Sequence, residues 1–350
     1  MLLQADRPLH SMAGPIASHC WDQAQRISPH VSLDSNAFLR SIARGNAFGA
    51  PGASGLADVH LQWCLRSARG VSTLMAAALL IAKGLVPEPV PWWLNFKHFT
   101  ALQVRVDKVR GITPEERLLA HTGAALLAPH SDRIANLVMP YQYGVCVPAG
   151  QEMFGHLVRA LLGEHGPWRL THILLVIDFA AAFDTISRAK FIQAIASKLG
   201  DLLPYALLRY GRASAGAFFL QQGQARGTGY PVEAAGKFLS MAAHPTTVQL
   251  ASVDNASLAP LVLAGDGGDQ GCSIMSASYC ITTAEPTSQV MDALRVQGSH
   301  LDPPLQSVAG CVVDDTALVV PLCLAEEALS LVDQFFAPYG QESIILCSRA

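Results

Sequence analysis

The sequence predicts an α+β protein in which a small antiparallel sheet carries acidic side chains at its strand ends. A run of β-branched and aliphatic residues, Ile173–Ile177, has the length of a buried strand and meets a carboxylate at Asp178. The segment 310–321, GCVVDDTALVVP, places Asp314 and Asp315 between two β-type runs, which is a hairpin pattern. Helical segments occur between these strands and before them, including an apolar one at Val71–Lys83.

Asp178 is the first candidate for chemistry. An acid at the end of a buried strand is costly unless hydrogen bonds or a metal compensate it. The alternative is that Asp178 caps the helix that follows, since Asp is a good N-cap. The residue alone does not decide between the two.

The pair Asp314 and Asp315 is also open to two interpretations. Adjacent acids in a turn are commonly just solvated. Carboxylates on a hairpin and at the end of a core strand can, however, converge on a hard cation such as magnesium, which prefers oxygen ligands and keeps room for substrate phosphates. The combination therefore predicts a metal-dependent phosphoryl-transfer site.

Three segments in the same order resemble the motifs of reverse transcriptases of the non-long-terminal-repeat retrotransposon type. They are DFAAAFDTISR with Asp178 and Phe183, GGDQGCSIMSASYC with Gln270 and Gly271, and VVDDTALVV with the acidic pair. The resemblance extends from about residue 44 to 340. It implies the polymerase right-hand fold, with an antiparallel palm sheet carrying the acids and a helical fingers region before it.

Two earlier segments add to the resemblance. The segment 140–162, PYQYGVCVPAGQEMFGHLVRALL, matches a signature of one branch of these polymerases, and its Glu152, His156 and Arg159 share one helix face. These three side chains would either contact the template strand or form ion pairs on the surface of the helix. For Glu152 we expect a structural role. The segment FGAPGASGL resembles a small-residue turn before a fingers helix, with Ser54 or Asp58 as the helix cap.

The resemblance also implies roles in nucleotide binding. The backbone oxygen of Phe179 would help to hold metal, and Phe183 would stack under the sugar and exclude a 2′-hydroxyl, unless it is only a core residue. Gln270 and Gly271 would let backbone approach the template and nucleotide. Arg110 and Lys97 would reach the triphosphate, or else are solvated charges.

The implied cofactor is a pair of Mg²⁺ ions, for which Mn²⁺ could substitute, held by Asp178 and Asp314 with Asp315 in support. The implied partners are an RNA template with a DNA primer, and deoxynucleoside triphosphates. The reaction would be nucleotidyl transfer to the primer 3′-hydroxyl.

Several departures from the family pattern favour a second hypothesis. Val312 replaces an aromatic residue, Ser273 and Gly111 replace prolines, and the thumb is missing. A catalytically inactive retroelement-derived fragment would explain them, and a non-catalytic nucleic-acid-binding or scaffold protein is the third hypothesis. The net charge of −3 is unusual for a nucleic-acid-binding protein, although basic residues gather between residues 97 and 117.

Composition sets the remaining expectations. Of the 350 residues, 51% are hydrophobic and 15% charged, which excludes extensive disorder. Eight cysteines without a C-x-x-C pair argue against zinc ligation and a disulfide framework. With no signal-peptide pattern and no apolar run long enough to span a bilayer, we expect a soluble intracellular protein, nuclear or cytoplasmic, without membrane partners.

The expected domain order is a lead-in at 1–40, a fingers-like region at 41–170, a palm at 171–340 and a truncated tail at 341–350. The palm would include an irregular insertion near 221–265. Residues 191–210 read as one amphipathic helix.

Overall fold

The computed structural model describes residues 16–105, 108–212, 214–218, 261–264, 267–269 and 271–347. These residues form helices and two four-stranded sheets, so the predicted α+β class is confirmed. The chain divides into two compact units. Unit 1 comprises Met1–Ala128 and Asp201–Ser273, and unit 2 comprises Pro129–Gly200 and Ile274–Ala350.

The sheet of unit 2 is antiparallel throughout and has the strand order β6-β7-β3-β8. Its strands are β3 (His172–Phe179), β6 (Val308–Val312), β7 (Asp315–Pro321) and β8 (Ser343–Cys347). Residues of β3 alternate between buried and half-buried positions near its end, with Ile177 and Phe179 buried and Asp178 half-buried. The expected core strand and the expected hairpin are therefore neighbours in one sheet.

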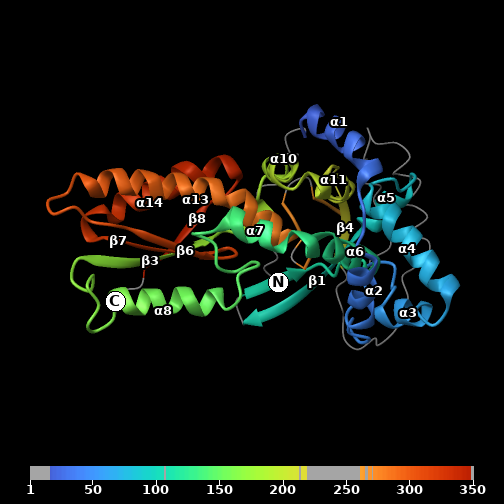
Figure 1. Cartoon of the computed structure of the whole chain (residues 1–350). Coiled ribbons are helices and arrows are strands. Elements are labelled where there is room, and N and C mark those ends of the chain that lie inside the picture. Colours follow the sequence, from blue (N-terminus) through green and yellow to red (C-terminus); the bar gives the residue numbers. More distant parts are fainter. Residues whose placement is uncertain are drawn as a thin grey trace. The chain divides into compact units, whose positions relative to one another are not determined.

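Helices cover both faces of this sheet (Figure 1). On one side α13 and α14 pack against each other, and on the other side α8 places Phe154 where Gly310 leaves room for its ring. The α-helices of unit 2 are α7 (Ser131–Val138), α8 (Gly150–Leu162), α9 (Ala182–Thr185), α10 (Arg188–Lys198), α13 (Met275–Ser299) and α14 (Ala325–Phe336). Short 3₁₀ turns lie at η2 (Ala128–His130), η3 (Gly200–Leu202), η4 (Leu322–Leu324) and η5 (Ala337–Tyr339).

Unit 1 is a helical assembly with its own sheet, of strand order β2-β1-β4-β5. The pair β1·β4 is parallel and the other pairs are antiparallel. Its core is formed by Phe38, Ile42, Leu61, Leu74, Ala78 and Ala125. Its elements are α1 (Ser18–Ile27), η1 (Ser28–His30), α2 (Ser35–Ala43), α3 (Asp58–Cys64), α4 (Ala68–Ala82), α5 (Val90–Leu94), β1 (Lys97–Arg105), β2 (Lys108–Ile112), α6 (Arg117–Leu127), α11 (Leu203–Tyr210), β4 (Ser214–Phe218) and β5 (Leu261–Ala264).

Some expectations differ from the structure. The single helix expected at 191–210 is two helices, α10 and α11, because Gly200 disfavours helix between them and Pro204 stands in the first turn of α11, where it cannot continue a helix from upstream. The lead-in expected at 1–40 is described from residue 16 onward. That part contains α1 and the start of α2. The expected tail contributes β8, which pairs with β3.

The division into units also differs from the expected boundary at residue 170. Residues 129–170 belong with the sheet that carries the acids, because the Tyr143 N–H donates to Cys311 O of β6, the Cys311 N–H donates to Tyr141 O, and α8 packs on the same strand. Most of the expected insertion at 221–265 lies outside the described residues, which include only β5 of it. No helix in the described ranges is long and apolar enough to cross a membrane.

Candidate active site

The end of β3 and the start of β7 bring carboxylates together in unit 2. Ile177 on β3 pairs with Thr316 on β7, and continuing this antiparallel register by one residue places Asp178 beside Asp315. Side chains directly opposite on antiparallel strands point to the same face and lie about 5 Å apart. Asp315 is exposed, whereas Asp178 and Asp314 are half-buried. The three acids predicted from sequence therefore lie at the same end of two neighbouring strands of one sheet. We call Asp178, Asp314 and Asp315 the strand-end acids.

Asp314 lies in a strained two-residue turn, Val313–Asp314, between Val312 and Asp315, which pair as the last rung of the hairpin. Val313 has φ of 59°, a left-handed conformation that a β-branched residue rarely adopts. Such strain persists only where the surroundings enforce it, and it concentrates at functional sites.

Gln142 enforces this turn. Its amide Oε1 accepts from the backbone N–H of Val313 (2.8 Å) and of Gly144 (2.9 Å), while Nε2 donates to the Val313 carbonyl (3.0 Å). Gly144 permits the approach, because a Cβ there would lie 2.6 Å from the Val313 nitrogen. The sequence signature at 140–162 thus supports the hairpin that carries Asp314 and Asp315, a role that its spacing alone did not reveal.

The capping alternative for Asp178 does not hold. The N-cap of α9 is Ala181, in the left-handed conformation, and no side chain caps the helix. The Phe179 side chain stacks on Phe336 with ring centroids 4.8 Å apart and is buried, so only its backbone could serve a ligand role.

Phe183 follows the end of β3 on α9 and is half-buried. Its ring lies 5.2 Å from that of Tyr279 on α13, tilted by 52°. Burial, together with the negative charges of Asp314 and Asp178, raises the pKa of Tyr279 well above its usual value. Tyr279 is thus a neighbour both of Phe183 and of the acids. The sequence analysis did not identify Tyr279 as a site residue.

The other predicted site residues belong to unit 1. Lys97 is buried and forms an ion pair with Asp269, which also accepts from Arg209 (3.2 Å). Gly271 has φ of 96°, which suits glycine. Arg110 is on β2, but its side chain lies outside the described part of the structure, as does all of Gln270.

The chemistry of the strand-end acids fits magnesium. The cation takes oxygen ligands and is usually held by one or two carboxylates, with water and substrate phosphates completing the shell. Among the described residues, no group of three or more His, Cys, Asp or Glu side chains has the spacing to hold a metal ion. A cation at this end of the sheet would therefore be held by one or two of the carboxylates together with water, rather than by a closed cage.

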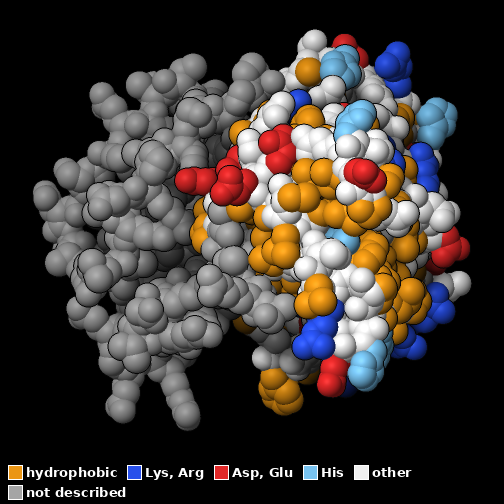
Figure 2. All heavy atoms as spheres, turned by 90° about the vertical axis from the view of Figure 1, so that its left-hand side faces the viewer, with side chains coloured by type: hydrophobic (Ala, Val, Ile, Leu, Met, Phe, Trp, Pro, Cys, Tyr) orange, Lys and Arg blue, Asp and Glu red, His pale blue; other side chains and the backbone are white. Residues whose placement is uncertain are grey.

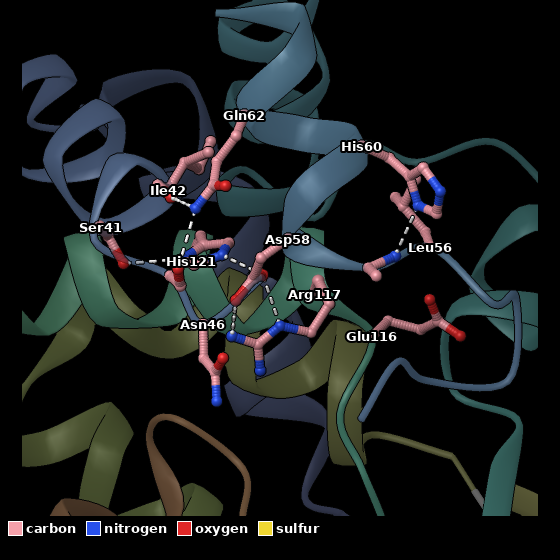
Figure 3. A network of polar contacts seen from close by, with 12 residues as sticks. Ser41, Ile42, Asn46, Leu56, Asp58, His60, Gln62, Glu116, Arg117 and His121 are labelled. Carbon is pink, nitrogen blue, oxygen red and sulfur yellow. Dashed lines mark hydrogen bonds and ion pairs between the residues drawn. The ribbon is translucent and has the colours of Figure 1, made fainter. Parts of the chain in front are cut away.

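A second polar cluster lies in unit 1 around Asp58, which is completely buried (Figure 3). Arg117 donates to both carboxylate oxygens (2.6 and 2.7 Å), and His121 Nε2 lies 2.9 Å from Oδ1. Ser41 Oγ lies 2.7 Å from His121 Nδ1, so serine, imidazole and carboxylate form a chain. Because the bidentate guanidinium already neutralises Asp58, we assign this cluster to stability rather than to nucleophilic catalysis.

Neither helix cap expected before α3 was correct. Asp58 is turned into the cluster just described, and the Ser54 hydroxyl donates to Glu116 Oε2 (2.6 Å). Glu152, His156 and Arg159 lie on α8, the helix on which the i, i+4, i+7 spacing predicted a shared face, and all three are exposed. Their role stays a prediction.

No known protein-family model matches the chain, and no curated protein matches it. The class defined by fold and site is therefore an α+β protein with a carboxylate-bearing antiparallel sheet. Any more specific assignment depends on the motifs and the geometry.

Proposed function

We propose that this chain is the RNA-directed DNA polymerase domain of a retroelement, with the sheet of unit 2 as its palm. The observation that supports the proposal is the antiparallel pair Ile177–Thr316 of β3 and β7, because Asp178 directly follows Ile177 while Asp315 and the hairpin turn with Asp314 directly precede Thr316. Like charges that lie close together on neighbouring strands repel each other at a modest cost, which a shared cation would remove. The order of the three motifs along the chain agrees with it.

The residues of the chain would have distinct tasks. Asp178 and Asp314 would hold magnesium together with the backbone oxygen of Phe179, and Asp315 would support them. When bound, the metal would supply charge neutralisation for a triphosphate and activation of a primer hydroxyl. Phe183 would lie under the nucleotide sugar, where a large ring excludes a 2′-hydroxyl by contact. The RNA template would be recognised by its A-form backbone and 2′-hydroxyls rather than by sequence.

The ion pair of Lys97 with Asp269 favours a second candidate function. A lysine that is buried and neutralised in this way contributes less to triphosphate binding than a free one. A retroelement-derived fragment that keeps the fold without activity would explain that pair and the substitutions at Val312, Ser273 and Gly111.

At the opposite end of β3, the described surface is mainly apolar, although Arg169 is exposed there. Leu170 and Leu322 are exposed there, next to the backbone hydrogen bond from Leu322 to Thr171 (3.0 Å). Figure 2 shows many apolar side chains on this end of unit 2, with Lys and Arg near the margins. Under this proposal, the nucleic acid would bind at the strand-end acids through the magnesium that they would hold.

Primer extension tests the proposal. The protein would be incubated with poly(rA)/oligo(dT), dTTP and Mg²⁺ or Mn²⁺ at low ionic strength, because contacts with the phosphate backbone weaken as salt rises and a chain with few basic residues binds weakly from the start. We expect extension by the unaltered protein and a loss of about a thousandfold in Asp314→Asn, which keeps the shape but removes a metal-binding charge.

The matched control is Asp292→Asn, which alters an exposed carboxylate paired with Arg295 on α13. It should extend the primer as the unaltered protein does, and all three proteins should give the same circular dichroism spectrum. A folded protein that does not extend the primer would exclude the polymerase and favour the inactive fragment.

A further inference from the structure

Residues 339–342 form a cradle around the α9 turn, which carries Phe183. The backbone N–H of Ser187 donates to Tyr339 O (2.9 Å), and that of Ala180 donates to Glu342 O (2.9 Å). Gly340 has φ of 76°, and a Cβ at this position would lie 2.4 Å from the Thr185 carbonyl oxygen. Only glycine allows this approach, so the cradle and the turn fit closely.

Gln341 lies at the centre of the cradle and is 3% exposed. Its Nε2 donates to the carbonyl oxygen of Ala182 (3.1 Å) and to Thr185 Oγ1 (3.2 Å), the residues on either side of the Phe183–Asp184 pair. Because a carbonyl oxygen can only accept, the amide nitrogen must face Ala182. The amide oxygen is thereby directed to Tyr279.

Tyr279 completes the connection. Its hydroxyl donates to Gln341 Oε1 (3.0 Å), and its ring packs against the Phe183 ring. One tyrosine therefore contacts the Phe183 ring directly and also holds the amide that fixes the backbone on both sides of it. Buried polar networks of this kind rigidify the groups that they join when every member is satisfied.

We propose that Tyr279 and Gln341 are positioning residues that hold the Phe183 ring in place and so set discrimination between deoxyribonucleotides and ribonucleotides. This inference rests on the polymerase function proposed above. A steric barrier rejects a 2′-hydroxyl only while the ring cannot move away, since a shift of about 1 Å changes such contacts strongly. Phe183 supplies the bulk, and the Tyr279–Gln341 pair supplies the rigidity.

The test compares kcat/KM for dTTP and UTP on poly(rA)/oligo(dT). Gln341→Leu removes all three polar contacts at similar size, and we expect the dTTP/UTP ratio to fall on the order of tenfold. Tyr279→Phe keeps the ring and removes one hydrogen bond, so the ratio should fall by about threefold. Gln341→Glu keeps the acceptor for Tyr279 but loses the donor to Ala182, and should resemble Gln341→Leu.

The matched control is Thr282→Val, also on α13, whose buried hydroxyl donates to Ser278 O of its own helix (2.6 Å). It should leave the ratio unchanged, while Phe183→Ala should abolish discrimination. Amide hydrogen exchange gives a second measurement that does not need activity. The N–H groups of Asp184 and Thr185, which donate to Ala181 O, should exchange about tenfold faster in Gln341→Leu than in Thr282→Val.

The outcomes separate the two proposals. A ratio that falls in Phe183→Ala but not in the Tyr279 and Gln341 variants overturns the positioning role and leaves the polymerase intact. Unchanged exchange at Asp184 and Thr185 in Gln341→Leu overturns the positioning role whatever the activity. Absence of extension by the unaltered protein overturns the polymerase, and the positioning role with it.

Discussion

The acids of unit 1 and the strand-end acids of unit 2 are the same kinds of side chain in opposite situations. Asp58 is completely buried and is matched by Arg117 and His121, and Asp269 is buried with Lys97 and Arg209. In the part of unit 2 that the structure describes, Asp178 and Asp315 have no ion-pair partner and lie where a strand ends or begins. Carboxylates with built-in partners stabilise a fold, whereas carboxylates gathered without them are available to an added cation.

The energetic reason is the cost of an uncompensated charge. A buried carboxylate requires a partner in the folded chain, because desolvation is otherwise too expensive. An exposed or half-buried carboxylate retains water and tolerates a neighbour of like charge at a modest cost. The comparison therefore predicts that stability depends on the acids of unit 1, whereas ligand binding depends on those of unit 2.

Asp58→Asn should have the largest effect on stability. The substitution leaves the Arg117 guanidinium without its bidentate partner, and since Arg117 is about one-quarter exposed, we expect a loss of about 3 kcal/mol in the free energy of unfolding. Urea titration followed by circular dichroism measures it. Asp292→Asn, in the exposed pair with Arg295, should change the same quantity by less than about 0.5 kcal/mol. Equal losses in the two variants would contradict the comparison.

Gln142→Leu should have the next largest effect, because Gln142 holds the backbone of the turn that carries Asp314. The substitution leaves the N–H groups of Val313 and Gly144 and the Val313 carbonyl without their partner, which costs about 2 kcal/mol. Amide exchange should rise at Val313 and at its neighbours in the turn.

The matched control for Gln142 is Gln151→Leu on the exposed side of α8, for which we expect a change within about 0.5 kcal/mol. If Gln142→Leu were as stable as this control, the strained turn would need another source of support.

The sequence predicted the strands correctly where a local hydrophobic pattern is next to acidic residues. The apolar run before Asp178 and the two β-type runs around Asp314 and Asp315 predicted strands that the structure contains, because period and turn chemistry are local properties. The acids could be grouped by sequence since each marks the end or the start of a strand.

Contacts between residues that are far apart in the sequence could not be predicted in this way. Asp58 and His121 are 63 residues apart, and Gln142 and Val313 are 171 residues apart. Nothing in the segment around Asp58 distinguishes a helix cap from a buried acid with a distant arginine. Gln341 likewise follows the last recognisable motif, and its importance comes from contacts with Ala182 and Tyr279 that only the fold provides.

A pH titration should reveal the smallest effect, through His121 in the Asp58 cluster. Burial lowers the pKa of His121 below the ordinary 6.5, although the hydrogen bond and charge of Asp58 oppose the shift and Arg117 adds to it. The unfolded chain therefore binds a proton at a higher pH than the folded chain does. Stability from this residue is fully present above about pH 6.5 and is lost as the pH falls toward the folded-state value, by at most about 1.4 kcal/mol per pH unit.

His121→Gln isolates this contribution, because its amide nitrogen can replace Nε2 as donor to Asp58 without titrating. The difference in unfolding free energy between the two proteins, measured from pH 7.5 to 5.0, should shrink or reverse in favour of the glutamine variant as the pH falls. That range stays above the titration of Asp58, whose pKa lies below its ordinary value since hydrogen bonds from Arg117 and His121 outweigh the effect of burial. Parallel pH profiles would show that protonated His121 is tolerated beside Asp58, and that this cluster is compensated by Arg117 alone.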